Sequence, residues 1–362
     1  MIQLNKQLAQ DIVNKMMEVI PYNVNIMNSE GVIIGSGDST RIGKIHEGAV
    51  KAISLKKLVM IYKDKGGAKP GVNMPIYFKG EIMGVIGISG EPDIVKQFAS
   101  IVKATATLLI NQEYMFSEQR SREQLKDELL YQWAFLIDKY DEDFIKRAAE
   151  LNIDLTIPRK AVIISSKRFE NIKIDKVRTY IEQKEYIIRI NPEEVVLLLK
   201  DDKILNYRIK QIYKEDFLKN SVIGVGTNNA IISKSVQEAL KCVEIIKKLD
   251  FSMELNEYNK IIPIDALSNV PYKEKYFNII KKLQEEGKGS DLIETLICFI
   301  KNNGEINSIA KELHIHRNSL NYRIRKIQDI TGKNLRNYTD LLELFTALVV
   351  FKLDKSDKSK SQ

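Results

Sequence analysis

Near its C-terminal end the chain carries a stripe of amide and cationic side chains that could read double-stranded DNA. Leu320, Ile324 and Ile327 recur at helical spacing and predict one buried helix face. At about 100° per residue, amides and cations collect on the opposite face, where asparagine and arginine can hydrogen-bond base edges in a major groove. The residues predicted to contact DNA are His316, Arg317, Asn318, Ser319, Asn321, Tyr322, Arg323, Arg325 and Lys326.

A second, shorter helix is predicted just upstream, over residues 307–313. Its apolar positions Ile309, Ala310 and Leu313 face inward, and Ile315 fills the turn, which gives the pattern of a helix-turn-helix. A basic helix face can also be an ordinary solvated surface. Residues 301–336 carry eight Lys/Arg against three Asp/Glu, a net of +5, and acids at i,i+4 spacing are mostly missing from the second helix. This local excess favours DNA binding.

A glycine-rich polar loop at 35–48 and a second loop at 69–75 carry the residues that could bind a small anion. The first loop runs into a predicted helix N-terminus, where unpaired backbone N–H groups favour negative charge. Arg41 can hold a carboxylate with two parallel hydrogen bonds, and His46 can add a donor. Each feature alone is typical of a turn or a solvated cation, but together they indicate a site for a small hydroxy acid. The predicted ligand-binding residues are Ser36, Gly37, Asp38, Arg41, Ile42, Gly43, His46, Glu47, Gly48, Lys69, Asn73 and Pro75.

Catalytic and metal chemistry find little support in the sequence. Two cysteines and three histidines are scattered without zinc spacing, and no Walker-type Gly-x-x-x-x-Gly-Lys loop occurs, so no cofactor, metal or catalytic residue is predicted. Cys242 and Cys298 each lie in a helical pattern, which favours free thiols in a reducing cytoplasm. The N-terminus shows no signal-peptide pattern, and no apolar run approaches the roughly 20 residues of a membrane span.

The helices and strands of the chain must position these residues. With 362 residues, the chain is long enough for two or three domains. A helix over 4–20 is followed by alternating strands and turns up to residue 89, the pattern of an antiparallel sensor sheet with helices. Its two hairpins turn at 28–31 and at Lys79-Gly80. The strands are predicted at 23–27, 32–34, 58–63, 72–78 and 81–89, with a helix over 46–57.

From Pro92 the pattern becomes a long helix with a heptad seam. It can be interpreted as one helix that packs on its own sheet, or as a signalling helix that also pairs two subunits. We favour the second interpretation, because polar interruptions would make the pairing weak enough to shift; a homodimer or higher homo-oligomer is therefore expected. The seam consists of Ile94, Phe98, Ile101, Thr105, Leu108, Gln112 and Met115.

Beyond the long helix, an α/β unit is expected over about 159–265, and the chain is helical after Pro271. The charged tail at 354–362 is expected to stay outside the fold. The predicted domains are 1–135, 140–265 and 270–362, an α+β multidomain chain with an all-α C-terminal domain. The strands of the α/β unit are predicted at 160–164, 186–190, 195–199 and 222–226, and the later helices at 233–248, 273–286, 289–302 and 338–353.

Two groups of motifs resemble the bacterial carbohydrate diacid regulators over essentially the whole chain. The C-terminal motif, 316–323, is also shared with the purine-catabolism (PucR-type) regulators. The resemblance implies a cytoplasmic transcriptional regulator, an activator as a rule, that responds to glucarate, galactarate or glycerate. It also implies a PAS-like or Cache-like sensor in which an Arg-Ile-Gly loop holds a ligand carboxylate, which points to Arg41 and His46. The N-terminal motifs are 25–27, 31–38, 41–43, 46–49, 75–78 and 84–87.

The middle unit is similar to the degenerate GGDEF-like domain of the same family. Where an active cyclase has Gly-Gly-Asp/Glu-Glu-Phe, this chain has 191–195, Asn-Pro-Glu-Glu-Val. The missing glycines imply a packing or dimerisation role instead of nucleotide turnover. Two other functions stay open at this point: a residual cyclase or phosphodiesterase in the middle unit, and a signalling scaffold whose basic helix contacts a protein.

Overall fold

The computed structural model describes residues 4–64, 69–166, 170–249, 256–287 and 291–354. The chain divides into two compact units, Met1–Leu125 and Lys126–Gln362. The predicted tail at 354–362 and the start of the helix predicted at 289–302 fall largely outside the described residues. The three-domain division stays a prediction. None of the helices in the described ranges is both long and apolar enough to cross a bilayer.

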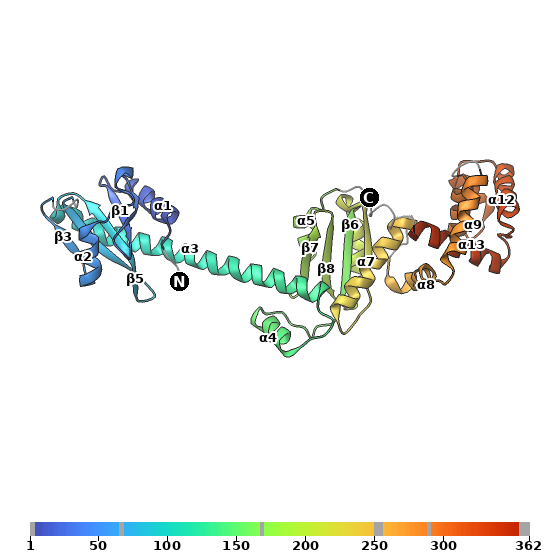
Figure 1. The fold of residues 1–362 in the computed structure, drawn as a ribbon, viewed down its shortest axis with the longest axis horizontal. Coiled ribbons are helices and arrows are strands. Elements are labelled where there is room, and N and C mark those ends of the chain that lie inside the picture. The colour runs from blue at the N-terminus through green and yellow to red at the C-terminus, as the bar shows by residue number, and fades with distance from the viewer. Residues whose placement is uncertain (1–3, 65–68, 167–169, 250–255, 288–290, 355–362) are drawn as a thin grey trace. The chain divides into compact units, whose positions relative to one another are not determined.

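The first unit is built on a five-stranded antiparallel sheet, of which Figure 1 labels β1, β3 and β5. The strand order is β2-β1-β5-β4-β3. Both predicted hairpins are confirmed. Lys79 and Gly80 link β4 to β5 with φ of 50° and 87°, the left-handed pair that matches the twist of a two-residue hairpin. The elements are α1 (Lys6–Met17), β1 (Val24–Asn28), β2 (Ile33–Ser36), the 3₁₀ turn η1 (Ser39–Arg41), α2 (Glu47–Leu55), β3 (Val59–Ile61), β4 (Gly71–Phe78) and β5 (Glu81–Ser89).

The two faces of this sheet carry different cores. Even-numbered strand residues such as Ile26 and Ile86 pack with α1 and with the first part of α3 (Pro92–Phe135). Odd-numbered residues such as Met27 and Val85 pack in a smaller core with Ala49 of α2. Since strand side chains alternate between faces, the N-terminal end of α2 covers the face that holds the predicted ligand residues.

The helix α3 uses one stripe to pack on its own sheet and leaves a different stripe exposed. Val95, Ala99, Val102, Ala106 and Ile110 are buried in the sheet core. In contrast, the seam residues Ile94, Ile101, Leu108 and Met115 are 44%, 61%, 66% and 69% exposed within the chain. These four seam residues therefore do not attach the helix to its sheet, whereas the seam residue Phe98 packs against the sheet core.

The second unit contains a four-stranded antiparallel sheet in the order β7-β8-β6-β9. The sequence pattern predicted an α/β unit; the strands are present, but the class is α+β. The reason is that the strands pair antiparallel. Two residues join β7 to β8, which is too short for a parallel crossover, and β8 also pairs antiparallel with β6 on its other side. The elements are α4 (Glu142–Glu150), β6 (Arg159–Ser166), α5 (Ile174–Arg178), β7 (Tyr186–Asn191), β8 (Glu194–Lys200), α6 (Leu205–Tyr213), η2 (Asp216–Leu218), β9 (Ser221–Val225), α7 (Ile232–Leu249) and α8 (Tyr258–Ser268).

The C-terminal part is all helical, as predicted. Its core gathers Ile280, Leu296, Ile309, Leu320 and Leu344 from its five helices. The end of α13 also contributes Val349 and Leu353 to the core of the four-stranded sheet. The helices are α9 (Lys273–Glu286), α10 (Asp291–Lys301), α11 (Ile306–Glu312), α12 (Arg317–Thr331) and α13 (Tyr338–Asp354).

Candidate ligand site and nucleic-acid interface

A row of buried polar residues crosses the sensor sheet on the face that α2 covers. Ser36 pairs with Asn25, Asn25 with Gly87, and Gly87 with Asn73 in the strand register. The three polar side chains are at most 3% exposed. The Ser36 hydroxyl donates to Asn25 Oδ1 at 2.6 Å, whereas buried Asn73 Oδ1 has no hydrogen-bond partner among the described residues. Such an acceptor carries a desolvation cost that a bound donor would remove.

Gly48 and Gly87 allow the neighbouring elements to pack closely around the Asn73 amide. A Cβ at Gly48 would lie 2.6 Å from Asn73 Nδ2 and 3.1 Å from His46 Cε1, so the amide lies directly under the start of α2. A Cβ at Gly87 would lie 3.0 Å from Asn73 Oδ1. The predicted residues His46, Gly48 and Asn73 are thus brought together from a loop, a helix and a strand.

His46 is the N-cap of α2, and this capping role determines which of its ring nitrogens can bind a ligand. Its Nδ1 accepts a hydrogen bond from the Ala49 backbone N–H at 3.3 Å. Burial, and then the positive charge of Arg41, hold the pKa of His46 below its usual value. The imidazole is therefore neutral near pH 7, with Nδ1 as acceptor and Nε2–H as the available donor.

Arg41 lies at the end of η1, close enough to Asp38 and His46 for its charge to act on both. It is only 8% exposed although it belongs to a loop, and its charge acts on the pKa of both neighbours. Asp38 caps the turn by accepting from the Thr40 N–H at 3.2 Å. A buried guanidinium beside a neutral imidazole donor is suited to a carboxylate with an adjacent hydroxyl.

The other predicted residues of the two loops lie around this cluster. Lys69 forms a long ion pair with Asp38 (Nζ–Oδ2 4.0 Å) and is half exposed, so it joins the two loops at the surface. Pro75 is buried on β4, whereas Ile42, Gly43 and Glu47 are exposed. A separate open cavity of about 580 Å³ lies between α1 and the first loop. Gln10, Asn14, Met17, Glu18, Ser36, Gly37, Ser39 and Ile42 line it.

Asn25, Gly87 and Gln10 belong to this region and were not predicted. Asn25 stands between Val24 and Ile26 in an apolar strand, so a polar residue at an inward position was the available signal. Gln10 Oε1 accepts from the Ser36 N–H at 3.1 Å, and its Nε2 donates to the Ser36 carbonyl at 3.1 Å. Only the strand register and the packing of α1 reveal these contacts.

The helix-turn-helix forms as the pattern predicted. Glu305 caps α11 by accepting from the Ser308 N–H at 2.6 Å, and His316 caps α12 by accepting from the Asn318 N–H at 3.2 Å. Leu320 and Ile327 of α12 are fully buried against the helical core. Gly332, at φ of 68°, ends α12 in the left-handed conformation.

The polar face of α12 is exposed along its N-terminal half. Tyr322 is 65% exposed, and Arg317, Asn318, Ser319 and Arg325 are exposed as well. Asn321, Arg323 and Lys326 are half-buried on the flanks. The Arg323 guanidinium donates to Asp291 of α10 at 2.9 Å, so one of the predicted cations is already paired within the domain.

The β7–β8 turn of the middle sheet holds its carboxylate in an internal network. Glu194 accepts from the Ser165 hydroxyl and, at 3.1 Å, from the Asn191 amide. The Lys247 ammonium donates to Ser165 Oγ at 2.6 Å and lies 3.7 Å from Glu194. The Glu194 carboxylate therefore has partners within the fold, and the packing or dimerisation role of the middle unit stays a prediction.

Comparison with known proteins matches both ends of the chain to families. Residues 4–133 match the family described as "Putative sugar diacid recognition", and residues 292–350 match the "PucR C-terminal helix-turn-helix domain". An uncharacterized protein of Haemophilus influenzae is 28% identical over 95% of this chain and 98% of its own length. The carbohydrate diacid regulator of Escherichia coli is 27% identical over 95% of this chain and 97% of its own. The proline-responsive transcriptional activator PutR of Bacillus subtilis is 20% identical over 76% of this chain and 74% of its own.

A sugar diacid recognition domain together with a helix-turn-helix defines the class of DNA-binding transcriptional regulators. The chain is a PucR-family helix-turn-helix transcriptional regulator with an N-terminal sugar diacid recognition domain, and it is homologous to the E. coli carbohydrate diacid regulator over nearly its full length. Homology to transcriptional regulators indicates a regulator that is not an enzyme.

Proposed function

We propose that the sensor domain binds a small hydroxy acid of the glycerate, glucarate or galactarate class, and that binding changes how the protein acts on operator DNA, as an activator in the cytoplasm. The observation that carries the ligand proposal is the cluster of buried Arg41, His46 and Asn73. In this arrangement Arg41 holds the ligand carboxylate, and the Nε2–H of His46 adds a donor. A ligand hydroxyl donates to Asn73 Oδ1, which has no partner within the described residues.

The proposed path from ligand to DNA begins at Asn73 on β4. The same strand ends at the turn in which Lys79 donates to the Tyr114 hydroxyl of α3 at 2.7 Å. The Phe78 and Tyr114 rings make an edge contact at 5.0 Å. A ligand that shifts β4 would thereby bias the position of α3, provided that it binds one arrangement better than the other.

The dimer forms part of this proposal, with the exposed seam of α3 as its interface. Ile94, Ile101, Leu108 and Met115 recur every seven residues, and Phe98, Thr105 and Gln112 lie between them. Apolar residues at this spacing pair helices side by side. A second copy would cover the seam and place two helix-turn-helix units on paired half-sites.

A thermal-shift series on the full chain tests the ligand proposal. Glycerate, glucarate, galactarate and succinate are added to the wild type, to Arg41→Ala and to Lys44→Ala, an exposed cation of the same loop. A bound acid raises the melting temperature by mass action. We expect at least one hydroxy acid to stabilise the wild type and Lys44→Ala but not Arg41→Ala. A shift that persists in Arg41→Ala, or no shift with any acid, would overturn the assignment.

DNA binding is tested with duplexes from the chain's own promoter region, measured by fluorescence anisotropy with and without the stabilising acid. Steep weakening with salt is expected of a phosphate-binding face. An acid that binds but leaves both affinity and DNA-bound conformation unchanged would contradict the coupling between the two sites.

A further inference from the structure

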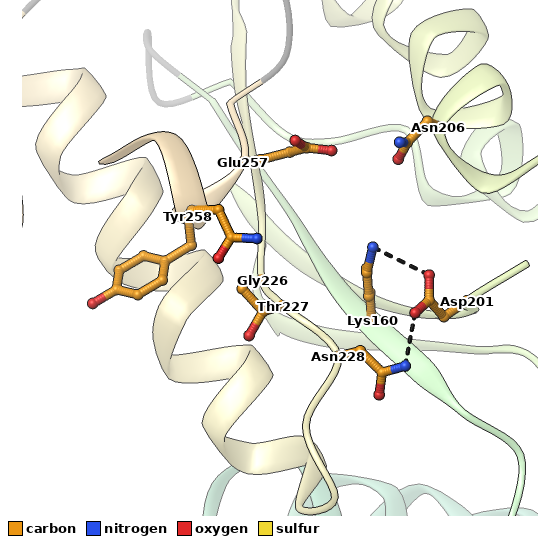
Figure 2. Close-up of a pocket in the computed structure, with 9 residues that line it drawn as sticks. Lys160, Asp201, Asn206, Gly226, Thr227, Asn228, Glu257 and Tyr258 are labelled. Atoms are coloured by element: carbon orange, nitrogen blue, oxygen red, sulfur yellow. Dashed lines mark hydrogen bonds and ion pairs between the residues drawn. The ribbon is translucent and has the colours of Figure 1, made fainter. Parts of the chain in front are cut away.

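The middle sheet has a polar pocket of about 480 Å³ at the end opposite the β7–β8 turn (Figure 2). It lies where β6 begins and where β8 and β9 end, and the starts of α6 and α8 complete its wall. Its size suits a small metabolite, and it belongs to a different compact unit from the residues assigned to the sensor site. The lining residues are Lys160, Asp201, Asn206, Gly226, Thr227, Asn228, Glu257, Tyr258 and Asn259.

The floor of the pocket is already held in place. Asp201 receives the Lys160 ammonium on Oδ1 at 3.1 Å and the Asn228 amide on Oδ2 at 2.7 Å, as Figure 2 shows. The neighbouring Thr227 gives both its backbone N–H and its hydroxyl to Glu238 of α7, at 2.7 and 2.6 Å. A ligand entering this pocket would therefore meet a wall that needs little reorganisation.

Glu257 is positioned by backbone pairing and not by its own carboxylate. The Val225 N–H donates to the Asn256 carbonyl at 2.9 Å, and the Asn256 amide donates to the Ile223 carbonyl at 2.9 Å. This places Glu257 beside the end of β9 in a parallel bridge with Val225. Within the described ranges, no hydrogen bond or ion pair engages the half-buried Glu257 carboxylate, which extends toward Asn206 in Figure 2.

The charges of the lining define what could bind. Lys160 and Asp201 neutralise one another, so Glu257 leaves the pocket with a net charge of −1. The remaining polar groups are mostly amides, which accept hydrogen bonds from ammonium and hydroxyl groups. No group of three His, Cys, Asp or Glu that could hold a metal ion occurs in the described part of the chain. An organic cation satisfies these groups better than an anion does.

We propose that this pocket is a second small-molecule site, for a primary amine that carries further hydrogen-bonding groups. The ammonium pairs with Glu257, and the amides of Asn206, Asn228 and Asn259 take the rest of the ligand. The site would give the regulator a second chemical input, distinct in charge from the acid at the sensor domain.

Matched probe pairs test the proposal on the full chain by calorimetry. Ethanolamine, putrescine and glucosamine are compared with their uncharged counterparts ethylene glycol, butanediol and glucose, at constant ionic strength. We expect at least one amine to bind and its uncharged partner not to bind. Loss of a charge-assisted hydrogen bond in Glu257→Gln should weaken that binding about tenfold or more.

Two control variants separate this site from others. Glu170→Gln removes an exposed carboxylate elsewhere in the middle unit, and Arg41→Ala removes the proposed acid site; both should bind the amine as the wild type does. If no amine binds, or if Glu257→Gln binds unchanged, the proposal is overturned. Loss of amine binding in Arg41→Ala would also overturn it, because the amine would then occupy the sensor domain.

Discussion

Arg323 of α12 is held by Asp291 of α10, with 2.9 Å between the guanidinium Nη2 and the carboxylate. The ion pair links α12 to α10. The side chain of Arg323 is 22% exposed and that of Asp291 is 63% exposed. Arg325, two residues further, lies exposed on the polar face. The two arginines therefore differ in their surroundings, although the sequence pattern assigned both to DNA.

The first prediction separates these roles. Arg325→Ala should weaken binding to promoter duplex by about 1–3 kcal/mol. Arg323→Ala should cost up to about 1 kcal/mol of domain stability through the lost ion pair, with a smaller effect on affinity. Anisotropy titrations at several salt concentrations and thermal melts of each variant measure the two effects. Lys281→Ala, on the exposed side of α9, serves as the control, and wild-type affinity in Arg325→Ala would refute the assignment.

The second prediction concerns the close packing of Gly48 against Asn73. Gly48→Ala places a Cβ against Ile61 and 2.6 Å from Asn73 Nδ2, so the amide must move. Alanine at a helical glycine normally stabilises by about 1 kcal/mol, but overpacking here should cancel that gain. We expect the acid-induced thermal shift to disappear. Gly80→Ala at the β4–β5 turn, where a Cβ meets nothing within 4 Å, should keep the shift despite its strained φ. A full shift in Gly48→Ala would show that the acid binds elsewhere.

The third prediction follows from the lowered pKa of His46. Burial, then Arg41, lower that pKa in the folded state below its usual value of 6.5. The unfolded chain therefore binds the His46 proton more readily than the folded chain does. The contribution of neutral His46 to the free energy of unfolding is complete above pH 6.5 and is lost as pH falls toward the folded-state pKa. His46→Asn, which can still cap α2, should lose melting temperature less steeply between pH 7.5 and 5.5 than the wild type. Parallel pH profiles of the two proteins would refute this explanation.

Local patterns were sufficient to predict most of the fold. The Lys79-Gly80 turn and the stripe of Leu320 and Ile327 depend on neighbours within a few residues, and the structure confirms both. The helix α6 was missed although Leu205, Ile209 and Ile212 show helical spacing. The helix α8 was obscured by Pro263 in its interior.

The site was predictable only in part, for a different reason. Arg41 and His46 stand in a polar loop whose composition indicates a ligand. Asn25 and Gly87 can be recognised as site residues only when the register of three strands places them in one row with Asn73. The pairing of Asn25 with Gly87 joins residues 62 apart in the chain and depends on long-range contacts that no local window contains.

The fourth prediction tests the exposed seam of α3. Leu108 lies on it and is 66% exposed within the chain, whereas Ala106, two residues earlier, is fully buried against the sheet. Leu108→Glu should leave the sensor domain folded and abolish self-association, because each apolar seam residue buried between copies is worth about 1.5–3 kcal/mol. Ala106→Glu should unfold the sensor domain, since it places an unpaired charge in its core. Sedimentation equilibrium and thermal melts distinguish the two results. A wild-type chain that stays monomeric at all concentrations, or a Leu108→Glu variant that still dimerises, would exclude the seam as the interface between copies.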